Sequence, residues 1–480
     1  MIPPLALEFS VVLLGIFMLM FEAFNPGADK RIIGWFAILV LAGVLTCTFF
    51  LQPVSAVLEA MGFYVADPQG LFFKRIILVA GILTLLASMD YIPVFSRYVP
   101  AERPGAGVGE FLTLPVFATA GLMWMTTAAD FVMIFVALEL VTITFYIQVA
   151  GMRKNKASIE AGVKYLILGA LSTGFLVYGI TWIFGVTGQT SLDGLKQILP
   201  DLNPEGLTGL LFGFGLVMVA LGFKIAAVPF QFWVPDVYQG APTPVTASLS
   251  VASKAAGFIV LLRVLEPFLV LPVIREKVLL ALGVVAGLTL LYGNLAAMPQ
   301  NNLKRLLAYS SIAHAGYVLL GVSSVMSGSA GRAIAFYLAG YAIMTFAAFL
   351  VLVIVSRQTG GDEISDFNGL VRRSPFLAGC MGLAMVSLAG LPFTVGFLGK
   401  FLIFESAVAA GLVVLVIIGV VAVACGFYYY FKVVRAVFWQ SPSDDSTIEV
   451  PVATRAALWV LSLATIVFGI FPQPILAMLG

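Results

Sequence analysis

Runs of about twenty consecutive apolar residues recur along the whole chain, each separated from the next by a short polar or turn-forming connection. A helix needs about twenty apolar residues to cross a bilayer, because each residue advances it by only about 1.5 Å. Of the 480 residues, 61% are hydrophobic and only 10% are charged, and no polar stretch is long enough to fold by itself. The sequence therefore predicts an all-α polytopic membrane protein built as one helical bundle.

The breaks between the apolar runs predict about fourteen transmembrane helices. The first run lacks the basic start of a cleaved signal peptide, so we expect it to remain as a helix. An even number of spans places both termini on one side of the membrane. Loop cations are concentrated on the other side, among them Lys30, Arg153, Arg372 and Arg373, whereas the terminal side holds fewer, such as Lys74. The positive-inside rule therefore predicts that both termini face outward.

Two of these segments contain helix-breaking residues near their middles. Pro229 interrupts the seventh segment, because its ring removes a backbone hydrogen bond and displaces the carbonyl of Ile225. The twelfth contains LAGLPFTVGFLGKF (388–401), where Pro392 frees the carbonyl of Leu388 for water or an ammonium group. Such breaks at corresponding places in two halves indicate two inverted five-helix repeats, each with one discontinuous helix.

This pattern predicts four parts along the chain. We expect three N-terminal transmembrane helices in residues 1–108, a first repeat in 109–271, a second, inverted repeat in 272–438 and a C-terminal helix in 439–480. The two halves have little direct sequence similarity, so the division depends on the positions of the breaks.

Four charged residues lie near the middle of apolar segments: Glu139, Lys224, Lys254 and Lys400. A charge at the bilayer centre costs roughly 2.5–3.5 kcal/mol on insertion scales, so these residues must face one another or water. A desolvated lysine releases its proton more readily, and a nearby carboxylate reverses this effect. Arginine stays protonated in proteins and cannot act in this way. Three lysines and a glutamate at this depth therefore predict a proton relay in the membrane plane.

Further polar residues allow more than one interpretation. Lys164 either extends to the membrane surface or points inward toward Lys224, and its spacing from Glu160 favours a local ion pair. His314 is the single histidine. It is expected either to bond to Ser310 or Ser311 as a structural residue or to carry protons in the relay.

Near the end of the eighth segment, Arg263 and Glu266 lie one helical turn apart and are expected to pair with each other.

Cofactor motifs are lacking in the sequence itself. Cys47, Cys380 and Cys425 occur singly, with no Cys-x-x-Cys pair, which argues against iron–sulfur and zinc sites. No glycine-rich phosphate loop follows a plausible strand, so neither a nucleotide nor a flavin is expected in this chain. The net charge of +2 is too small to indicate nucleic-acid binding.

Three stretches of the chain resemble the antiporter-like membrane subunits of bacterial respiratory complex I, the proton-pumping NADH:quinone oxidoreductase. They are KIAAVPFQFWVPDVYQGAPTPVTASLSVASKAAGF (224–258), NNLKRLLAYSSIAHAGY (301–317) and LAGLPFTVGFLGKF (388–401). Within the family, DVYQGAPTPVTA is similar to the subunit N branch, and a lysine at position 400, where the M branch has glutamate, argues against M. The length argues against the L branch, which carries a long lateral helix. The resemblance covers essentially the whole chain.

The resemblance implies roles for individual residues. Glu139 and Lys224 correspond to the Glu–Lys pair of an inner half-channel, and Lys254 to the lysine that bridges two half-channels. Lys400 corresponds to the terminal lysine that faces the outer half-channel, and Lys164 to a lysine near the first pair. The chain itself would then bind no cofactor.

The same resemblance implies the surroundings in which the chain works. NAD, FMN, iron–sulfur clusters and quinone would belong to partner subunits, and the partners would be neighbouring membrane subunits of the complex and the lipid bilayer. The chain would lie in the bacterial inner membrane with both termini on the periplasmic side. Two alternatives remain open: a component of a sodium/proton antiporter, and a structural membrane scaffold whose buried charges only set helix register.

Overall fold

The computed structural model describes residues 4–25, 27, 29–51, 62–100, 107–442, 444 and 446–479. The helices of the first half are α1 (Leu5–Phe24), α2 (Lys30–Phe50), α3 (Pro68–Phe95), α4 (Val108–Thr127), α5 (Phe131–Val149), α6 (Lys156–Thr187), α7 (Leu192–Ile198), α8 (Pro204–Ile225), α9 (Trp233–Gly240), α10 (Thr243–Ser248) and α11 (Lys254–Phe268). A π-helical turn, Leu249–Ser253, joins α10 to α11.

The longer elements of the second half are also helices. They are α12 (Pro272–Ala297), α13 (Leu303–Ser323), α14 (Ala330–Thr359), α15 (Leu370–Arg373), α16 (Pro375–Ala389), α17 (Val395–Ala409), α18 (Val413–Trp439), α19 (Val452–Ile470) and α20 (Gln473–Leu476). Within the described residues, thirteen helices are long and apolar enough to cross a membrane. The short helices α16 and α17 together form the remaining segment, so the all-α fold of about fourteen spans is confirmed.

Polar residues at the segment ends explain where many of these helices begin. Asp67, Asp130, Asn155 and Asn302 each precede a helix and accept a hydrogen bond from a backbone N–H of its first turn. These N–H groups have no partner inside the helix, so a capping side chain stabilises the start.

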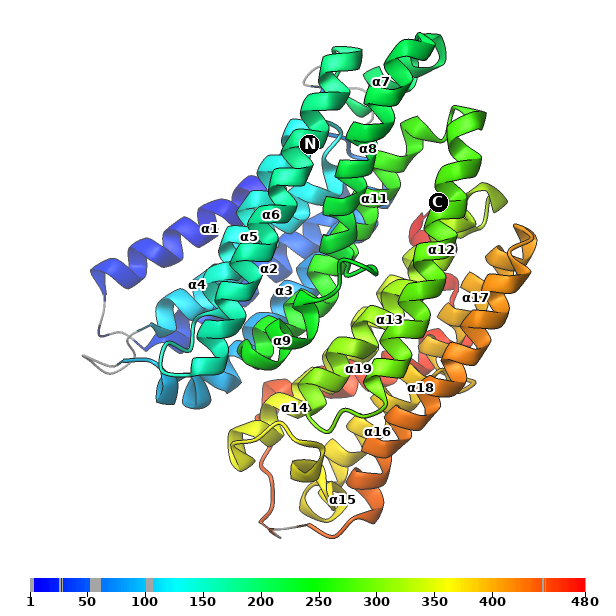
Figure 1. The fold of residues 1–480 in the computed structure, drawn as a ribbon. Coiled ribbons are helices and arrows are strands. Elements are labelled where there is room, and N and C mark those ends of the chain that lie inside the picture. The colour runs from blue at the N-terminus through cyan, green and yellow to red at the C-terminus, as the bar shows by residue number, and fades with distance from the viewer. Residues whose placement is uncertain are drawn as a thin grey trace.

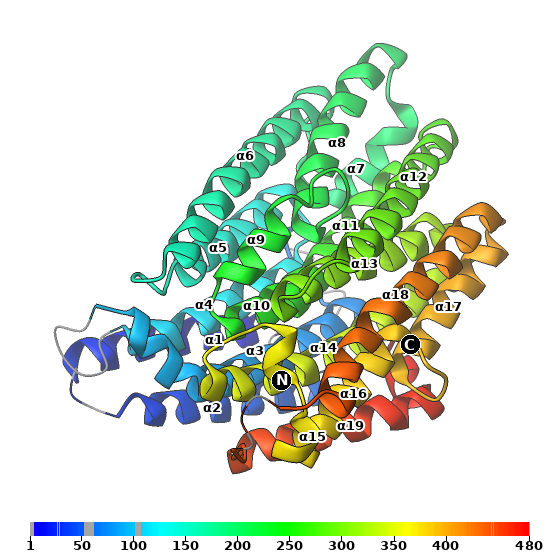
Figure 2. The ribbon, with the colours of Figure 1, turned by 60° about the horizontal axis from the view of Figure 1, so that its bottom comes forward.

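The core of the bundle is formed by α10, α11, α13 and α14. The whole spanning window of α13 is buried, compared with 22% of the corresponding windows of α6 and α19. Figure 2 shows α13 and α14 in the middle of the bundle, with α6 and α17 toward opposite edges. The apolar faces of the outer helices are left for lipid or for other membrane proteins.

Both chain termini lie toward the end of the bundle that holds α7 (Figure 1), and we call this end the terminal face. The last turns of the chain contact α3 and α14 there. The other end holds α15, and we call it the opposite face.

The two predicted breaks are present. Helix α8 ends at Ile225 and is followed by Ala226 with a φ of 64°, and α16 ends before Gly390 with a φ of 94°. Phe393, in the second break, also has a positive φ of 66°. Ala226 and Phe393 are the only non-glycine residues with positive φ in the described chain, and such conformations cost free energy. The boundaries of the two inverted repeats stay a prediction.

Candidate functional site

The predicted mid-membrane charges lie at irregular points of the backbone. Lys224 is in the last turn of α8, directly before the first break. Lys254 is the first residue of α11 and follows the π-helical turn. Lys400 lies in α17, soon after the second break. All three side chains are at most 5% exposed. We call Glu139, Lys224, Lys254, His314 and Lys400 the central row.

Glu139 and Lys224 do not meet in an ion pair in this structure. The Glu139 carboxylate accepts hydrogen bonds from Thr142, at 3.2 Å, and from Thr173, at 2.7 Å. The Lys224 ammonium has no hydrogen-bond partner among the described residues. Its stem packs beside Gly257, one turn beyond Lys254 on α11. A buried ammonium without a partner is costly.

Lys254 is held by α13. Its ammonium donates hydrogen bonds to the backbone carbonyl and to the hydroxyl of Ser311. Ser250, in the π-helical turn, bonds to the hydroxyl of Tyr341 at 2.7 Å. π-helical turns within α-helices are frequent at functional sites.

Lys400 binds the carbonyls that the second break exposes. Its ammonium donates to Leu388 at 2.9 Å and to Ala389 at 2.8 Å. The Leu388 carbonyl therefore accepts a hydrogen bond from an ammonium group, one of the two partners predicted for it. At the first break, the Phe223 carbonyl instead accepts a hydrogen bond of 3.0 Å from the indole of Trp233.

Aromatic rings connect Lys254 to Lys400 through His314. The Lys254 Nζ lies 5.9 Å from the centre of the Tyr341 ring, which lies 4.8 Å from the His314 ring. On the other side, the His314 ring is 6.1 Å from the Tyr317 ring, and the Lys400 Nζ is 5.1 Å from that ring. His314 therefore lies between the two lysines.

Hydrogen bonds from other helices hold the His314 ring. Its Nδ1 lies 2.7 Å from the hydroxyl of Tyr337, and its Nε2 lies 3.1 Å from that of Tyr430. The expected hydrogen bond between His314 and Ser310 or Ser311 is wrong, because tyrosines of α14 and α18 bond to both ring nitrogens. Ser310 bonds to Tyr430 instead. A tyrosine hydroxyl both donates and accepts, so either tautomer of the imidazole is satisfied.

Lys164 lies apart from the central row. Its ammonium forms the expected ion pair with Glu160, at 2.8 Å, and a second one with Asp236 of α9, at 2.7 Å. Asp236 also pairs with Arg305 at 2.7 Å. Lys164 is 42% exposed, and it points toward α9 rather than toward Lys224.

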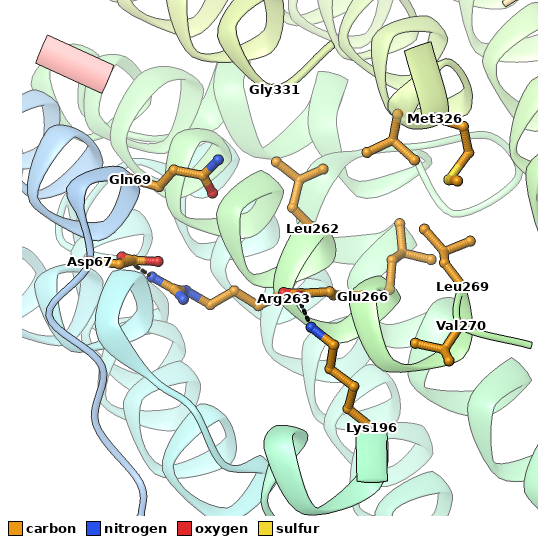
Figure 3. Close-up of a pocket in the computed structure, with 12 residues that line it drawn as sticks. Asp67, Gln69, Lys196, Leu262, Arg263, Glu266, Leu269, Val270, Met326 and Gly331 are labelled. Atoms are coloured by element: carbon orange, nitrogen blue, oxygen red, sulfur yellow. Dashed lines mark hydrogen bonds and ion pairs between the residues drawn. The ribbon is translucent and has the colours of Figure 1, made fainter. Parts of the chain in front are cut away.

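Two ion pairs line a cavity of about 390 Å³ at the terminal face (Figure 3). Arg263 pairs with Asp67 at 2.7 Å and donates to the Thr126 carbonyl at 2.9 Å, whereas Glu266 pairs with Lys196 at 2.6 Å. The expected Arg263–Glu266 pair is therefore wrong. The hydrogen bond to Glu266 raises the pKa of Lys196, so its ammonium remains charged at neutral pH. Each charge at this cavity has an opposite partner.

A buried ion pair between α1 and α3 was not predicted from the sequence. Glu8 and Lys74 lie 2.6 Å apart, and both side chains are fully buried. Tyr64 donates to Glu8 at 3.2 Å and accepts from Lys74 at 3.1 Å, and Thr127 also donates to Glu8, at 3.3 Å. The assignment of Lys74 to a loop is wrong. The available signal was an acidic residue inside the first apolar run.

Metal binding has no support in the geometry. In the part of the chain that the structure describes, no group of histidine, cysteine, aspartate and glutamate side chains is arranged to hold a metal ion.

Comparison with known sequences gives one consistent result. The family described as NADH:quinone oxidoreductase/Mrp antiporter, TM, matches residues 128–426. The NADH-quinone oxidoreductase subunit N of Moorella thermoacetica is 38% identical over 472 residues, which cover 98% of this chain and 96% of that protein. Its counterpart in Desulforamulus reducens is 39% identical over 470 residues, covering 98% and 95%.

Comparison with solved structures agrees with the sequence comparison. A chain of respiratory complex I from Thermus thermophilus is similar with a TM-score of 0.79 and 30% identity, covering 99% of both chains. A chain of an archaeal membrane-bound sulfane sulfur reductase has a TM-score of 0.85 at 24% identity, covering 98% of this chain and 95% of that one. A chain of the Mrp complex from Dietzia has a TM-score of 0.81 at 20% identity, covering 99% and 96%. The last two similarities establish the fold alone.

Proposed function

This chain belongs to the antiporter-like membrane subunits of NADH:quinone oxidoreductase, in the subunit N branch, and from that premise we propose that its central row carries protons across the membrane. The chain is thus one subunit of a proton-translocating oxidoreductase, a multi-pass inner-membrane protein whose partners are other membrane subunits. The proton path and its coupling to quinone reduction are the proposal.

One observation carries the proposal: each lysine of the central row lies at a break or distortion of a helix. Irregular backbone at membrane depth is tolerated where it is buried in protein or lines a water-filled cavity. A buried charge that only fixes helix register needs no such break beside it. The breaks let the surroundings of each ammonium change, and this alters how tightly it holds its proton.

We propose that protons enter from the opposite face near Glu139 and Lys224, pass through Lys254 and His314 to Lys400, and leave at the terminal face. The termini would face the periplasm. The energy would come from quinone reduction elsewhere in the complex, where NAD, FMN, iron–sulfur clusters and quinone would bind. A change of charge that separates Glu139 further from Lys224 would favour release of the lysine proton toward Lys254.

The test replaces Lys254 with arginine in the assembled complex. Lys254→Arg keeps a positive charge but removes a group that can deprotonate, so we expect NADH-driven proton pumping to fall at least about tenfold. Lys196→Arg, at the surface of the same chain, is the matched control and should pump normally. Normal pumping in an assembled Lys254→Arg complex would mean that a fixed charge suffices, and would overturn the proposal.

The scaffold alternative has its own test. Buried ion pairs with a purely structural role are often replaceable by apolar or neutral residues. We expect the double variant Glu139→Gln/Lys224→Met to lose pumping, and normal pumping in this variant would favour the scaffold. For the sodium/proton antiporter alternative, a sodium requirement for proton movement by the isolated chain in liposomes would be decisive.

A further inference from the structure

A groove opens on the membrane-facing side of the bundle between α16 and α19. Its volume is about 760 Å³, and its lining is mostly apolar. Phe376 on α16 and Trp459 on α19 lie at one end, with ring centres 5.5 Å apart. Trp459 and Leu463 are each 62% exposed, so no described part of this chain covers the groove.

Two arginines come just before the groove-lining residues of α16 and α19, at the ends of these helices that are nearer the opposite face. Arg455 is one helical turn before Trp459 on the same side of α19, and Arg372 lies in α15, just before α16 begins. Both are exposed, and neither forms an ion pair with a described residue. The neighbouring Arg373 differs, because it is buried and donates to the carbonyls of Asp366 and Ser446.

We propose that this groove binds an anionic phospholipid, with an acyl chain between α16 and α19 and the phosphate at Arg372 and Arg455. An acyl chain gains little by leaving bulk lipid for an apolar groove, so the selectivity comes from the head group. Guanidinium groups bind phosphate through paired hydrogen bonds, and basic sites between helices near a membrane surface select anionic head groups.

The length of the groove favours a lipid over a helix of another subunit. Its lining on α16 runs from Pro375 to Leu383, and its lining on α19 from Trp459 to Ile466. At about 1.5 Å per residue, these stretches extend roughly 10–12 Å, less than half of a hydrocarbon core about 30 Å thick. A groove confined to one leaflet fits an acyl chain, whereas a partner helix would follow the whole span.

Gly379 provides a way to close the groove without disturbing the bundle. It lines the groove, and apart from its chain neighbours and the backbone of its own helical turn, no described atom lies within 4 Å of the position that a Cβ would take there. Gly379→Leu therefore fills space that the lipid would occupy. Gly174 on α6 has the same open surroundings outside the groove, so Gly174→Leu is the matched control.

The experiment reconstitutes the assembled complex in nanodiscs that contain photoactivatable phosphatidylglycerol or phosphatidylcholine and maps the cross-linked peptides by mass spectrometry. With two arginines at the head group, peptides covering 375–383 and 459–466 should label about tenfold more with phosphatidylglycerol. Gly379→Leu should abolish this labelling, and Gly174→Leu should retain it. Arg372→Gln/Arg455→Gln should bring the ratio of the two lipids close to one.

Three results would overturn the proposal. One is equal labelling by both lipids in the unaltered complex, and another is unchanged labelling in Gly379→Leu. The third is cross-linking of a photoreactive residue at position 379 to another subunit, which would make the groove a protein interface.

Discussion

A glycine fixes the position of Lys224. A Cβ at Gly257 would lie 2.9 Å from the Ile225 side chain and 3.3 Å from Cγ of Lys224. Because residue 257 has no side chain, the end of α8, which carries Lys224, can approach α11, which begins at Lys254. This contact places Lys224 and Lys254 of the central row on two helices that pack against each other.

Gly257→Ala should consequently shift Lys224 and lower pumping more than it lowers stability. Overpacking a tight contact costs about 1–3 kcal/mol, which a large assembled complex tolerates. We expect proton pumping per NADH oxidised to fall several-fold while a native gel still shows the complete complex. Gly174→Ala, in open surroundings, is the control. If both variants pump alike, Gly257 does not position Lys224.

The buried Glu8–Lys74 pair makes a prediction about stability. Glu8→Gln alone leaves the Lys74 ammonium buried without a full counter-charge, and breaking a buried pair in this way costs about 3–5 kcal/mol. The double variant Glu8→Gln/Lys74→Met removes both charges and should recover most of the loss. Thermal unfolding of the purified complex measures the difference. Equal destabilisation by the single and double variants would show that the pairing contributes little.

Hydropathy predicts the depth of a charged residue but not its partner. It placed Lys224, Lys254 and Lys400 inside apolar runs, where the structure has them buried. The partners of His314 and Arg263 come from other segments of the chain, and their choice depends on how each helix is rotated. A single sequence does not contain that information, so the local pairings expected for these two residues were wrong.

Tight packing between the two half-helices of the second broken segment, α16 and α17, holds Lys400 in place. A Cβ at Gly396 would overlap the carbonyl oxygen of Ser387. The start of α17 therefore packs directly against the end of α16, and Lys400 is thereby brought to the exposed carbonyls of Leu388 and Ala389.

Gly396→Ala should separate the two half-helices and remove Lys400 from these carbonyls. We expect strongly reduced pumping, together with a lower yield of assembled complex on a native gel. Gly379→Ala, in the same segment but with open surroundings, should behave as the unaltered protein. A fully active, fully assembled Gly396→Ala complex would contradict this account of the break.

The helix breaks could be predicted only where proline or glycine marks them. Pro229 and the glycine-rich stretch around Pro392 identified two breaks in the sequence. The π-helical turn at Leu249–Ser253 has no such mark, because SLSVAS is compatible with a regular helix. The turn therefore became visible only in the structure.

For the whole molecule, the count of spans and the all-α class followed from the apolar runs, because the length of a spanning helix is fixed by bilayer thickness. What the outer surfaces contact could not be predicted from the sequence. Hydropathy does not separate the faces that contact lipid from those that contact another subunit, because lipid tails are as apolar as leucine. The groove between α16 and α19 became recognisable only in the folded structure, because its lining comes from two helices that are far apart in the sequence.

The central claim is that Lys224 lies on the path of the translocated proton. NADH-driven proton pumping in membrane vesicles from cells carrying Lys224→Ala, with assembly checked on a native gel, tests it most directly. The account predicts that the complex assembles but that pumping and coupled quinone reduction are largely lost. Normal pumping by the assembled variant would contradict it, and Lys224 would then be a packing residue.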